Sequence, residues 1–65
     1  MSVIVNGEVR PLPEPPTLGA LLLQLAPSAP FAVARNEEFV PRSDYSGCRL
    51  ESGDRIEIVH PSVGG

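Results

Sequence analysis

The sequence predicts an α+β domain in which one mixed β-sheet packs on a single main helix. Short segments with alternating polar and apolar residues open and close the chain, which is typical of strands with one buried face. Between them lies one stretch whose leucines recur with helical spacing. Because this whole helical stretch separates the first strand from the last, the two strands can pair in parallel at the centre of the sheet.

The chain begins with a predicted β-hairpin. Residues 2–5 form a β-rich run, and Asn6-Gly7 follows directly. Asn-Gly is typical of the type I′ turn, because this turn requires a positive φ at both central residues. Residues 8–12 alternate polar and apolar side chains, which predicts a second strand with one buried face. Pro11 cannot donate to a strand ladder, so we expect this strand at a sheet edge or ending there.

Residues 17–26 are predicted to form the helix. Prolines at positions 13, 15 and 16 make a stiff connector, and Thr17 then suits the N-cap position. The apolar stripe of the helix consists of Leu18, Leu21, Leu22 and Leu25. Pro27 and Pro30 end the helix within a few residues. A helix this short is stable only when its stripe is docked, and the apolar face of the hairpin is the expected partner.

The second half of the chain predicts further strands over residues 31–35, 39–41 and 55–59. Turns are expected at residues 36–38 and 51–54, because Asn, Asp, Ser and Gly favour turns. Residues 42–49 predict a loop with one helical turn that Ser43 begins. The resulting order, β-β-α-β-β-β, is that of the ubiquitin-like β-grasp fold.

Length and composition exclude several classes of protein. The 65 residues leave room for one domain only. A formal net charge of −3, with no lysine, argues against a nucleic-acid-binding protein. No apolar run approaches the roughly 18 residues of a membrane span, so no membrane association is expected. The single cysteine, Cys48, excludes an internal disulfide and a cysteine-based zinc site, and it favours a cytoplasmic location.

After the last predicted strand the chain reads His60-Pro61-Ser62-Val63-Gly64-Gly65. Pro61 ends the strand, and nothing after it has the periodicity of the core. We therefore expect a β-grasp domain over residues 1–60 and a flexible Gly-Gly tail over residues 61–65. Two glycines give a chain end with the least steric bulk, so its carboxylate can enter a narrow channel and be reached by a nucleophile.

Several segments closely resemble the ThiS family, the sulfur carriers of thiamin thiazole biosynthesis. The segments are NEEFVPRS at residues 36–43, LESGDRIEIV at residues 50–59 and the terminal Gly64-Gly65. Residues 3–7 and the helix that begins at Thr17 fit the same family, so the resemblance covers the whole chain. Val40-Pro41-Arg42 favours ThiS over the related MoaD family of molybdopterin synthase. The departures are Pro15-Pro16 before the helix and the variable residues 60–62.

The resemblance implies a carrier rather than an enzyme. In the family, a ThiF-like adenylyltransferase uses ATP to adenylate the terminal glycine carboxylate, here that of Gly65. The adenylate receives sulfur that originates from a cysteine desulfurase, and the resulting thiocarboxylate donates sulfur to thiazole synthase, ThiG. Ser62, Val63 and Gly64 are then expected to enter the active sites of these partners. The carrier itself is expected to bind no cofactor or metal and to be a monomer when alone.

Strand parity predicts an outward apolar patch. If Val3 and Val5 lie in the core, Ile4 faces outward, and if Ile56 and Ile58 face the helix, Glu57 and Val59 face away from it. Phe39 and Val40 are adjacent and cannot both point inward. The predicted partner-docking surface is Ile4, Phe39, Glu57, Val59 and, at its rim, His60. Scattered surface residues without a role, and a plainly exposed His60, are the alternatives. Glu51, Asp54 and Glu57 could likewise meet basic partner residues or form a solvated turn.

Other functions stay open at this point. A carrier for molybdopterin synthesis or tRNA thiolation would use the same terminal chemistry. A ubiquitin-like modifier would instead join its last glycine to a target lysine, and a passive β-grasp interaction module would not react at all. Cys48 is interpreted as a small, partly buried loop residue, with a thiol nucleophile or persulfide relay as the alternative.

Overall fold

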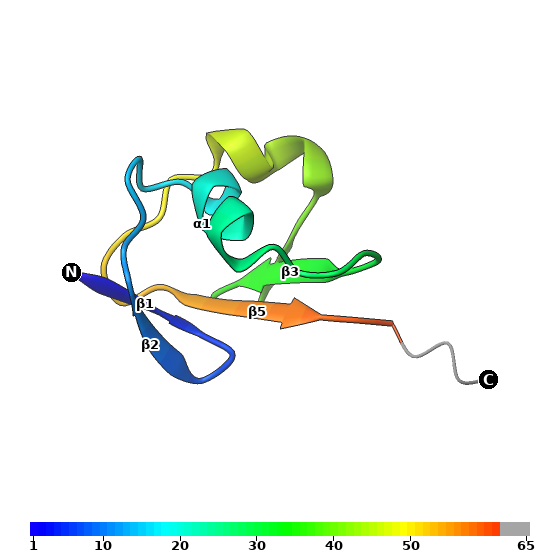
Figure 1. Ribbon diagram of the computed structural model, residues 1–65, viewed down its shortest axis with the longest axis horizontal. Helices are drawn as coiled ribbons and strands as arrows, with labels where there is room; N and C mark the ends of the chain where they lie inside the picture. The colour runs from blue at the N-terminus through cyan, green and yellow to red at the C-terminus, as the bar shows by residue number, and fades with distance from the viewer. Residues whose placement is uncertain (62–65) are drawn as a thin grey trace.

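The structure is a computed structural model that describes residues 1–61. Its elements are β1 (Ser2–Val5), β2 (Glu8–Pro11), α1 (Leu18–Leu25), β3 (Ala32–Arg35), β4 (Glu38–Val40), the 3₁₀ helix η1 (Arg42–Gly47) and β5 (Arg55–Val59). The predicted order of strands and main helix is confirmed, and η1 is the helical turn expected after β4. The sheet forms one layer, and α1 and η1 lie together over one of its faces (Figure 1).

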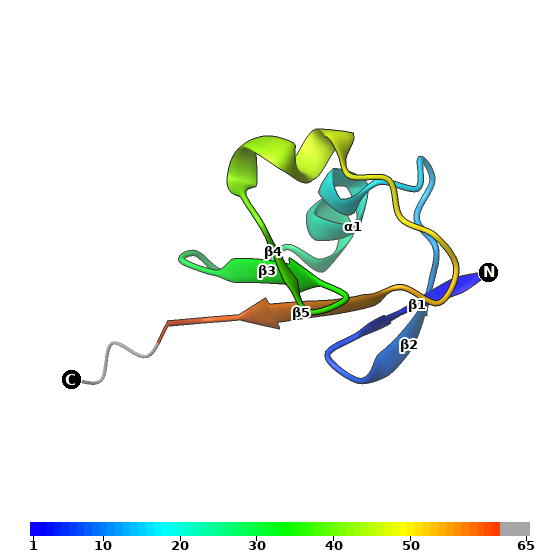
Figure 2. The ribbon, with the colours of Figure 1, turned by 180° about the vertical axis from the view of Figure 1, so that it is seen from behind.

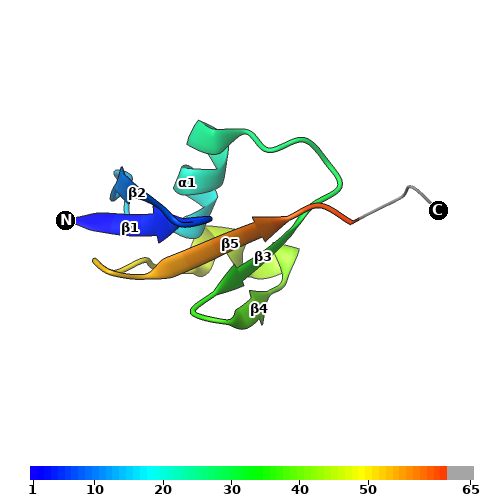
Figure 3. The ribbon, with the colours of Figure 1, turned by 90° about the horizontal axis from the view of Figure 1, so that it is seen from below.

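The last strand, β5, is the centre of a five-stranded mixed sheet with the order β2-β1-β5-β3-β4. β1 and β5 run parallel, as predicted from the helical crossover between them. β3 lies antiparallel on the other side of β5, and each of these neighbours is one strand of a hairpin. The hairpins β1-β2 and β3-β4 therefore flank β5, as Figure 3 shows.

The first hairpin turns as predicted, but the expected buried face of its second strand is wrong. Asn6 and Gly7 have φ values of 49° and 85°, which suit a type I′ turn. β2 is an edge strand, as Pro11 predicts, yet all 4 of its residues are exposed. The reason is that Val9 pairs with Ile4 and so lies on the sheet face opposite α1, where it is 72% exposed.

The helix forms where its leucine stripe predicts. Thr17 caps it, since its Oγ1 accepts a hydrogen bond of 3.2 Å from the amide of Ala20. At the other end Ala26 has a φ of 48° and donates its amide hydrogen to the Leu22 carbonyl. Gly19 faces η1, and a Cβ at this position would meet the Ser46 Cα at 3.4 Å, an ordinary van der Waals contact. Figure 2 shows η1 running beside α1 and above β4.

The core lies between the sheet and the helices and draws on every element except β2 and η1. Its buried apolar residues are Val3, Val5, Leu18, Leu21, Leu22, Val33, Val40, Leu50, Ile56 and Ile58. The parity predicted for β5 is confirmed, with Ile56 and Ile58 buried and Glu57 and Val59 exposed. The central strand is therefore fixed by its own side chains, and it is the strand that leads to the C-terminal residues.

Candidate functional site

Gly65, predicted to react, and Ser62, Val63 and Gly64, predicted to enter the partners' active sites, lie outside the residues that the structure describes. The predicted tail over residues 61–65 extends into the same stretch, so its division from a domain over residues 1–60 stays a prediction. The described part of the candidate site is therefore β5, which leads to these residues, together with the sheet face around it and the residues that follow Val59 (Figure 1).

Both hairpin turns hold β5 through an asparagine side chain. Asn6 accepts a hydrogen bond of 2.9 Å from the amide of Ile58 on Oδ1 and donates one of 3.3 Å from Nδ2 to the carbonyl of the same residue. On the other side of the strand, Asn36 Oδ1 accepts 2.9 Å from the Arg55 amide, and the Asn36 amide donates to the Arg55 carbonyl at 2.7 Å. The strand is therefore bound along its length by both neighbours.

Asp54 fixes the point where β5 begins. Its carboxylate accepts hydrogen bonds from Arg35 Nε at 2.9 Å, Asn36 Nδ2 at 3.2 Å and the Glu51 amide at 2.8 Å. Burial disfavours the charged form of Asp54, but the bonds from Glu51, Asn36 and Arg35 outweigh it, so its pKa lies below its ordinary value. Asp54 is only 7% exposed and bonds to these internal partners, so the solvated turn expected as one alternative is wrong for this residue. Sequence proximity to the exposed Glu51 and Glu57 is therefore misleading for this residue.

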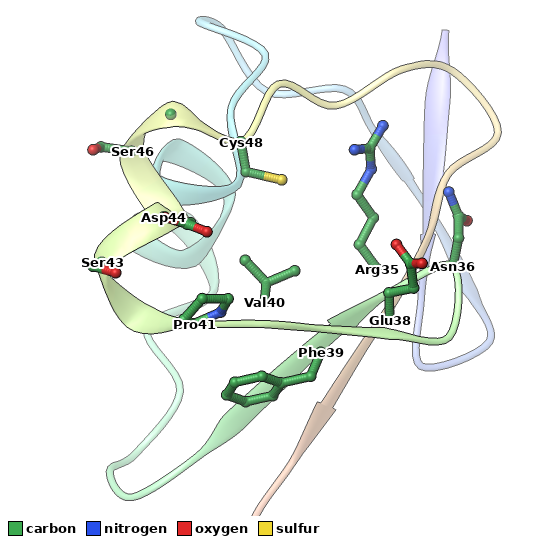
Figure 4. Close-up of a pocket in the computed structure, with 11 residues that line it drawn as sticks. Arg35, Asn36, Glu38, Phe39, Val40, Pro41, Ser43, Asp44, Ser46 and Cys48 are labelled. Carbon is green, nitrogen blue, oxygen red and sulfur yellow. The ribbon is translucent and has the colours of Figure 1, made fainter.

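The sheet face opposite α1 and η1, called the outer face, carries most of the predicted docking residues. The strand register places Glu57, Ala34 and Phe39 side by side in one row across β5, β3 and β4. Val59 pairs with Ala32 in the next row. Phe39 and Val59 are 69% and 57% exposed and lie in neighbouring rows of this face. Phe39 points away from the core-facing Val40, as Figure 4 shows.

Ile4 lies on the outer face in a neighbouring row, between Val9 on β2 and Arg55 on β5. It is only partly exposed, whereas Val9 is the more exposed apolar residue of this row. Val9 was not predicted as part of the surface. The signal was present, because a two-residue turn at Asn6-Gly7 places Val9 opposite Ile4.

His60 does not share the outer face. Its ring meets the ring of Phe31 edge-on, with centroids 6.5 Å apart and planes at 62°. Phe31 in turn stacks on Tyr45 of η1, with centroids 6.3 Å apart and planes at 12°. Phe31 and Tyr45 both pack against the core, so His60 lies on the helix side of the sheet. The structure thus brings Ile4, Phe39, Glu57 and Val59 onto one face and separates His60 from them.

A hollow of about 490 Å³ lies between η1 and the β3-β4 hairpin (Figure 4). Its lining mixes charges of both signs, including Arg35, Glu38 and Asp44, and the partly buried Cys48 directs its sulfur into it. Among residues 1–61, His, Cys, Asp and Glu form no group of three that could hold a metal ion. In the same part of the chain, no helix combines the length and apolarity that crossing a bilayer requires.

The sequence model of the ThiS family matches residues 3–65 of this chain. The chain belongs to the ThiS family. ThiS-family proteins are sulfur carriers of thiamine thiazole biosynthesis and are not enzymes. The match confirms the family that the resemblance of residues 36–43 and 50–59 implied.

One curated relative is a thiazole synthase from Paramagnetospirillum magneticum, which is 42% identical over 60 residues. The match covers 91% of this chain and 18% of the relative, so the chain spans less than a fifth of that protein. A solved structure, that of the thiamine biosynthesis protein ThiS from Geobacter metallireducens, superposes with a TM-score of 0.81 at 22% identity. The match covers 100% of both chains and confirms the β-grasp fold.

Proposed function

We propose that this chain carries sulfur as a thiocarboxylate on Gly65, for the thiazole ring of thiamin. The observation that carries the proposal is the family match, which extends to residue 65 and so includes both glycines. In the proposed sequence, a ThiF-like adenylyltransferase joins the Gly65 carboxylate to the AMP part of ATP and releases pyrophosphate. A cysteine desulfurase delivers sulfur as a cysteine persulfide, whose outer sulfur displaces AMP to give an acyl disulfide. A thiol then attacks the inner sulfur, which releases the thiocarboxylate on Gly65 and leaves a disulfide. Thiazole synthase, ThiG, takes the sulfur from the thiocarboxylate.

The proposed chemistry requires no catalytic side chain from the carrier. A carboxylate resists nucleophiles because it is negatively charged and lacks a good leaving group, and the adenylate removes both obstacles. The thiocarboxylate then presents a soft, nucleophilic sulfur. We propose that Ser62, Val63 and Gly64 enter the partners' active sites with Gly65, since Gly64 and Gly65 have no Cβ to obstruct a narrow channel. ATP is bound by the adenylyltransferase, and the carrier binds no cofactor itself.

The body of the domain supports this role by fixing where the reactive segment starts. β5 lies at the centre of the sheet and is held by the Asn6 and Asn36 side chains on its two sides. Pro61 has no amide hydrogen with which the strand ladder could continue. Four residues follow it, which can span at most about 14 Å. We propose that Gly65 enters an active site over this reach while the body stays on the partner's surface.

We propose the outer face as the docking surface for the adenylyltransferase. Phe39 and Val59 supply exposed apolar area, and Ile4 with Val9 extends it toward the sheet edge. Glu57 lies in the row of Phe39 and is exposed, so it can pair with a basic residue of the partner and orient the encounter. Val59 is also the last residue of β5, which places this surface beside the start of the reactive segment.

The match to a thiazole synthase supports thiazole synthase as the sulfur acceptor, because that relative contains a portion similar to this chain. We propose that the carrier works in the cytoplasm, as a monomer between partners, without contact to nucleic acid or membrane. Its acidic balance, a formal net charge of −3, suits basic surfaces on protein partners.

Intact-mass spectrometry tests the proposal. The chain is incubated with a ThiF-like adenylyltransferase, ATP, a cysteine desulfurase, cysteine and a thiol reductant, and we expect one oxygen to be replaced by sulfur. Deletion of Gly65 is expected to abolish the product without changing the thermal unfolding midpoint. Addition of thiazole synthase or of the large subunit of molybdopterin synthase then shows which acceptor removes the sulfur. Adducts on target lysines without any thiocarboxylate would contradict the proposal and indicate a protein modifier.

A further inference from the structure

The residue before Pro61 is held to the body by an aromatic contact rather than by the sheet. The ladder between β3 and β5 ends where Val59 pairs with Ala32. His60 follows, and its ring approaches Phe31 with a centroid separation of 6.5 Å and an interplanar angle of 62°. These values are those of a T-shaped aromatic pair. His60 is otherwise exposed, so this contact is its main tie to the domain.

Phe31 is itself fixed from two sides. Its other neighbour is Tyr45, whose ring lies 6.3 Å away and nearly parallel at 12°. Both rings are partly buried against the core, and Tyr45 belongs to η1. Pro30 precedes Phe31 and restricts the backbone there. Tyr45, Phe31 and His60, called the aromatic anchor, therefore connect the end of β5 to the helical layer.

We propose that the aromatic anchor sets the direction in which the C-terminal segment leaves the domain, and that His60 is thereby a positioning residue for adenylation of Gly65. The inference rests on the proposed function. Gly65 is five residues beyond His60, a span of at most about 17 Å. A segment that starts in a fixed direction samples less space, which raises the effective concentration of its carboxylate at the partner's nucleotide.

A role of His60 in the aromatic anchor and a role in docking on the partner predict different kinetics. The docking proposed above uses the outer face, whereas His60 and Phe31 contact each other on the opposite side of the sheet. Loss of the anchor should therefore leave binding of the body unchanged and lower the fraction of bound carriers whose Gly65 is in place. We expect this fraction to fall roughly 2- to 10-fold, the range that one aromatic pair contributes to an equilibrium.

The experiment measures acyl-adenylate formation in single turnovers with a ThiF-type adenylyltransferase, ATP and the 65-residue chain. For His60→Ala we expect the rate at saturating carrier to fall roughly 2- to 10-fold, with the half-saturating carrier concentration unchanged. His60→Phe, which can make the same edge-to-face contact, should restore the rate. Gln24→Ala, at an exposed position of α1, is the matched control and should react like the unaltered chain.

Phe31→Leu keeps an apolar side chain beside Tyr45 and tests the contact from its other partner. It should lower the rate as His60→Ala does, and the double variant should lose little more, because both changes remove one contact. Thermal unfolding of each variant shows that the chain is folded. In NMR spectra, the ring-current shift of the His60 ring protons should disappear in Phe31→Leu, which reports the contact independently of activity.

Three results would overturn the proposal: an unchanged rate for His60→Ala, a change in half-saturation alone, or a His60→Phe variant as slow as His60→Ala. The second result would assign His60 to the docking surface, and the third would assign a role to the imidazole itself. Absence of any adenylate with the unaltered chain would instead overturn the proposed function, and the positioning role with it, while the NMR shift would still report the aromatic contact.

Discussion

The two hairpins that flank β5 have the same residue type at the first turn position and different residue types at the second. Each turn starts with an asparagine, Asn6 with a φ of 49° and Asn36 with a φ of 50°. Each asparagine also extends the sheet by hydrogen-bonding a backbone group of β5 with its side chain. The following residue is Gly7 in the first hairpin and Glu37 in the second, at φ values of 85° and 72°.

The difference between Gly7 and Glu37 separates two requirements of a turn residue, tolerance of a positive φ and a side chain that bonds to the neighbouring strand. Asparagine tolerates the left-handed region better than most residues, and here its amide group is also needed to hold the central strand. The side chain at the second turn position makes no hydrogen bond to the backbone of β5, and glycine enters the left-handed region without the strain that a Cβ causes. Glu37 therefore carries conformational strain that Gly7 avoids. The second hairpin adds something the first lacks, a buried carboxylate at Asp54 that binds both Arg35 and Asn36.

The largest loss of stability is expected when the hydrogen bonds of the Asp54 carboxylate are removed. Asp54→Ala removes the acceptor of Arg35 Nε, Asn36 Nδ2 and the Glu51 amide. We expect a loss of about 2–4 kcal/mol in the free energy of unfolding, because buried donors lose their partner while Arg35 can partly rehydrate. Urea unfolding measures it, with the exposed Glu57→Ala as control, expected within about 0.5 kcal/mol. A similar small loss for both variants would show that the network does not stabilise the second hairpin.

The next largest loss of stability is expected at Asn6 and Asn36. Replacing each by alanine and by glycine separates the lost hydrogen bonds from the strain at positive φ. Asn6→Ala and Asn36→Ala should each lose about 2–3 kcal/mol, from the bonds to β5 and from alanine's strain at positive φ. The glycine variants remove the same bonds without the strain and should lose about 1 kcal/mol less. Asn36 also donates to Asp54, so its loss should be non-additive with Asp54→Asn, whereas that of Asn6 should add. Equal additivity for both would contradict the proposed difference between the hairpins.

Acid should weaken the second hairpin first. The pKa of Asp54 in the folded chain lies below its ordinary value, because hydrogen bonds outweigh the effect of burial. Its stabilisation is therefore present above the unfolded-state pKa of about 3.9 and is lost as the pH falls through the lower folded-state value. Urea midpoints between neutral and acidic pH measure the decline, and Asp54→Asn should reduce its slope. An equal slope in the variant would assign the acid sensitivity to other carboxylates.

The hairpins also show what the sequence could reveal of the fold. Asn6-Gly7 predicts its turn by local chemistry alone, and the alternation around Ile56 and Ile58 predicts their burial. The alternation around Val9 predicted a buried face that does not exist. Alternation shows that a strand has two different faces, but which face is covered depends on where the helix packs. The burial of Asp54 was not predicted for the same reason, since it depends on Arg35 and Asn36 of the β3-β4 hairpin.

In the candidate site too, some residues could be placed from local sequence alone and others only from contacts between distant segments. Parity in single strands was enough to place Ile4, Glu57 and Val59 on the outer face, because alternation is a local property. The position of His60 required knowledge of Phe31 and Tyr45, which come from different elements and meet only in the folded chain. Ser62, Val63, Gly64 and Gly65 were identified by their resemblance to a family, and their roles stay predictions.

The smallest effect is expected where the hairpins differ most directly. Glu37→Gly removes the strain of a Cβ at a φ of 72° and should raise the free energy of unfolding by about 0.5 kcal/mol, a shift of about 2–4 °C in the unfolding midpoint. The gain is limited because glycine also increases the freedom of the unfolded chain. The ion pair with Arg55, at 3.7 Å between exposed side chains, is lost as well and contributes little.

Two matched variants decide whether strain is the cause. Glu37→Ala removes the carboxylate but keeps the Cβ, so it should show no gain. Gly7→Ala introduces the strain into the first hairpin at a φ of 85°, where open space surrounds the new Cβ, and should lose about 1 kcal/mol. Because the added methyl group meets no neighbour within 4 Å, that loss can come only from the backbone conformation. A gain for Glu37→Ala equal to that for Glu37→Gly would show that the charge of Glu37, and not its φ, distinguishes the two turns.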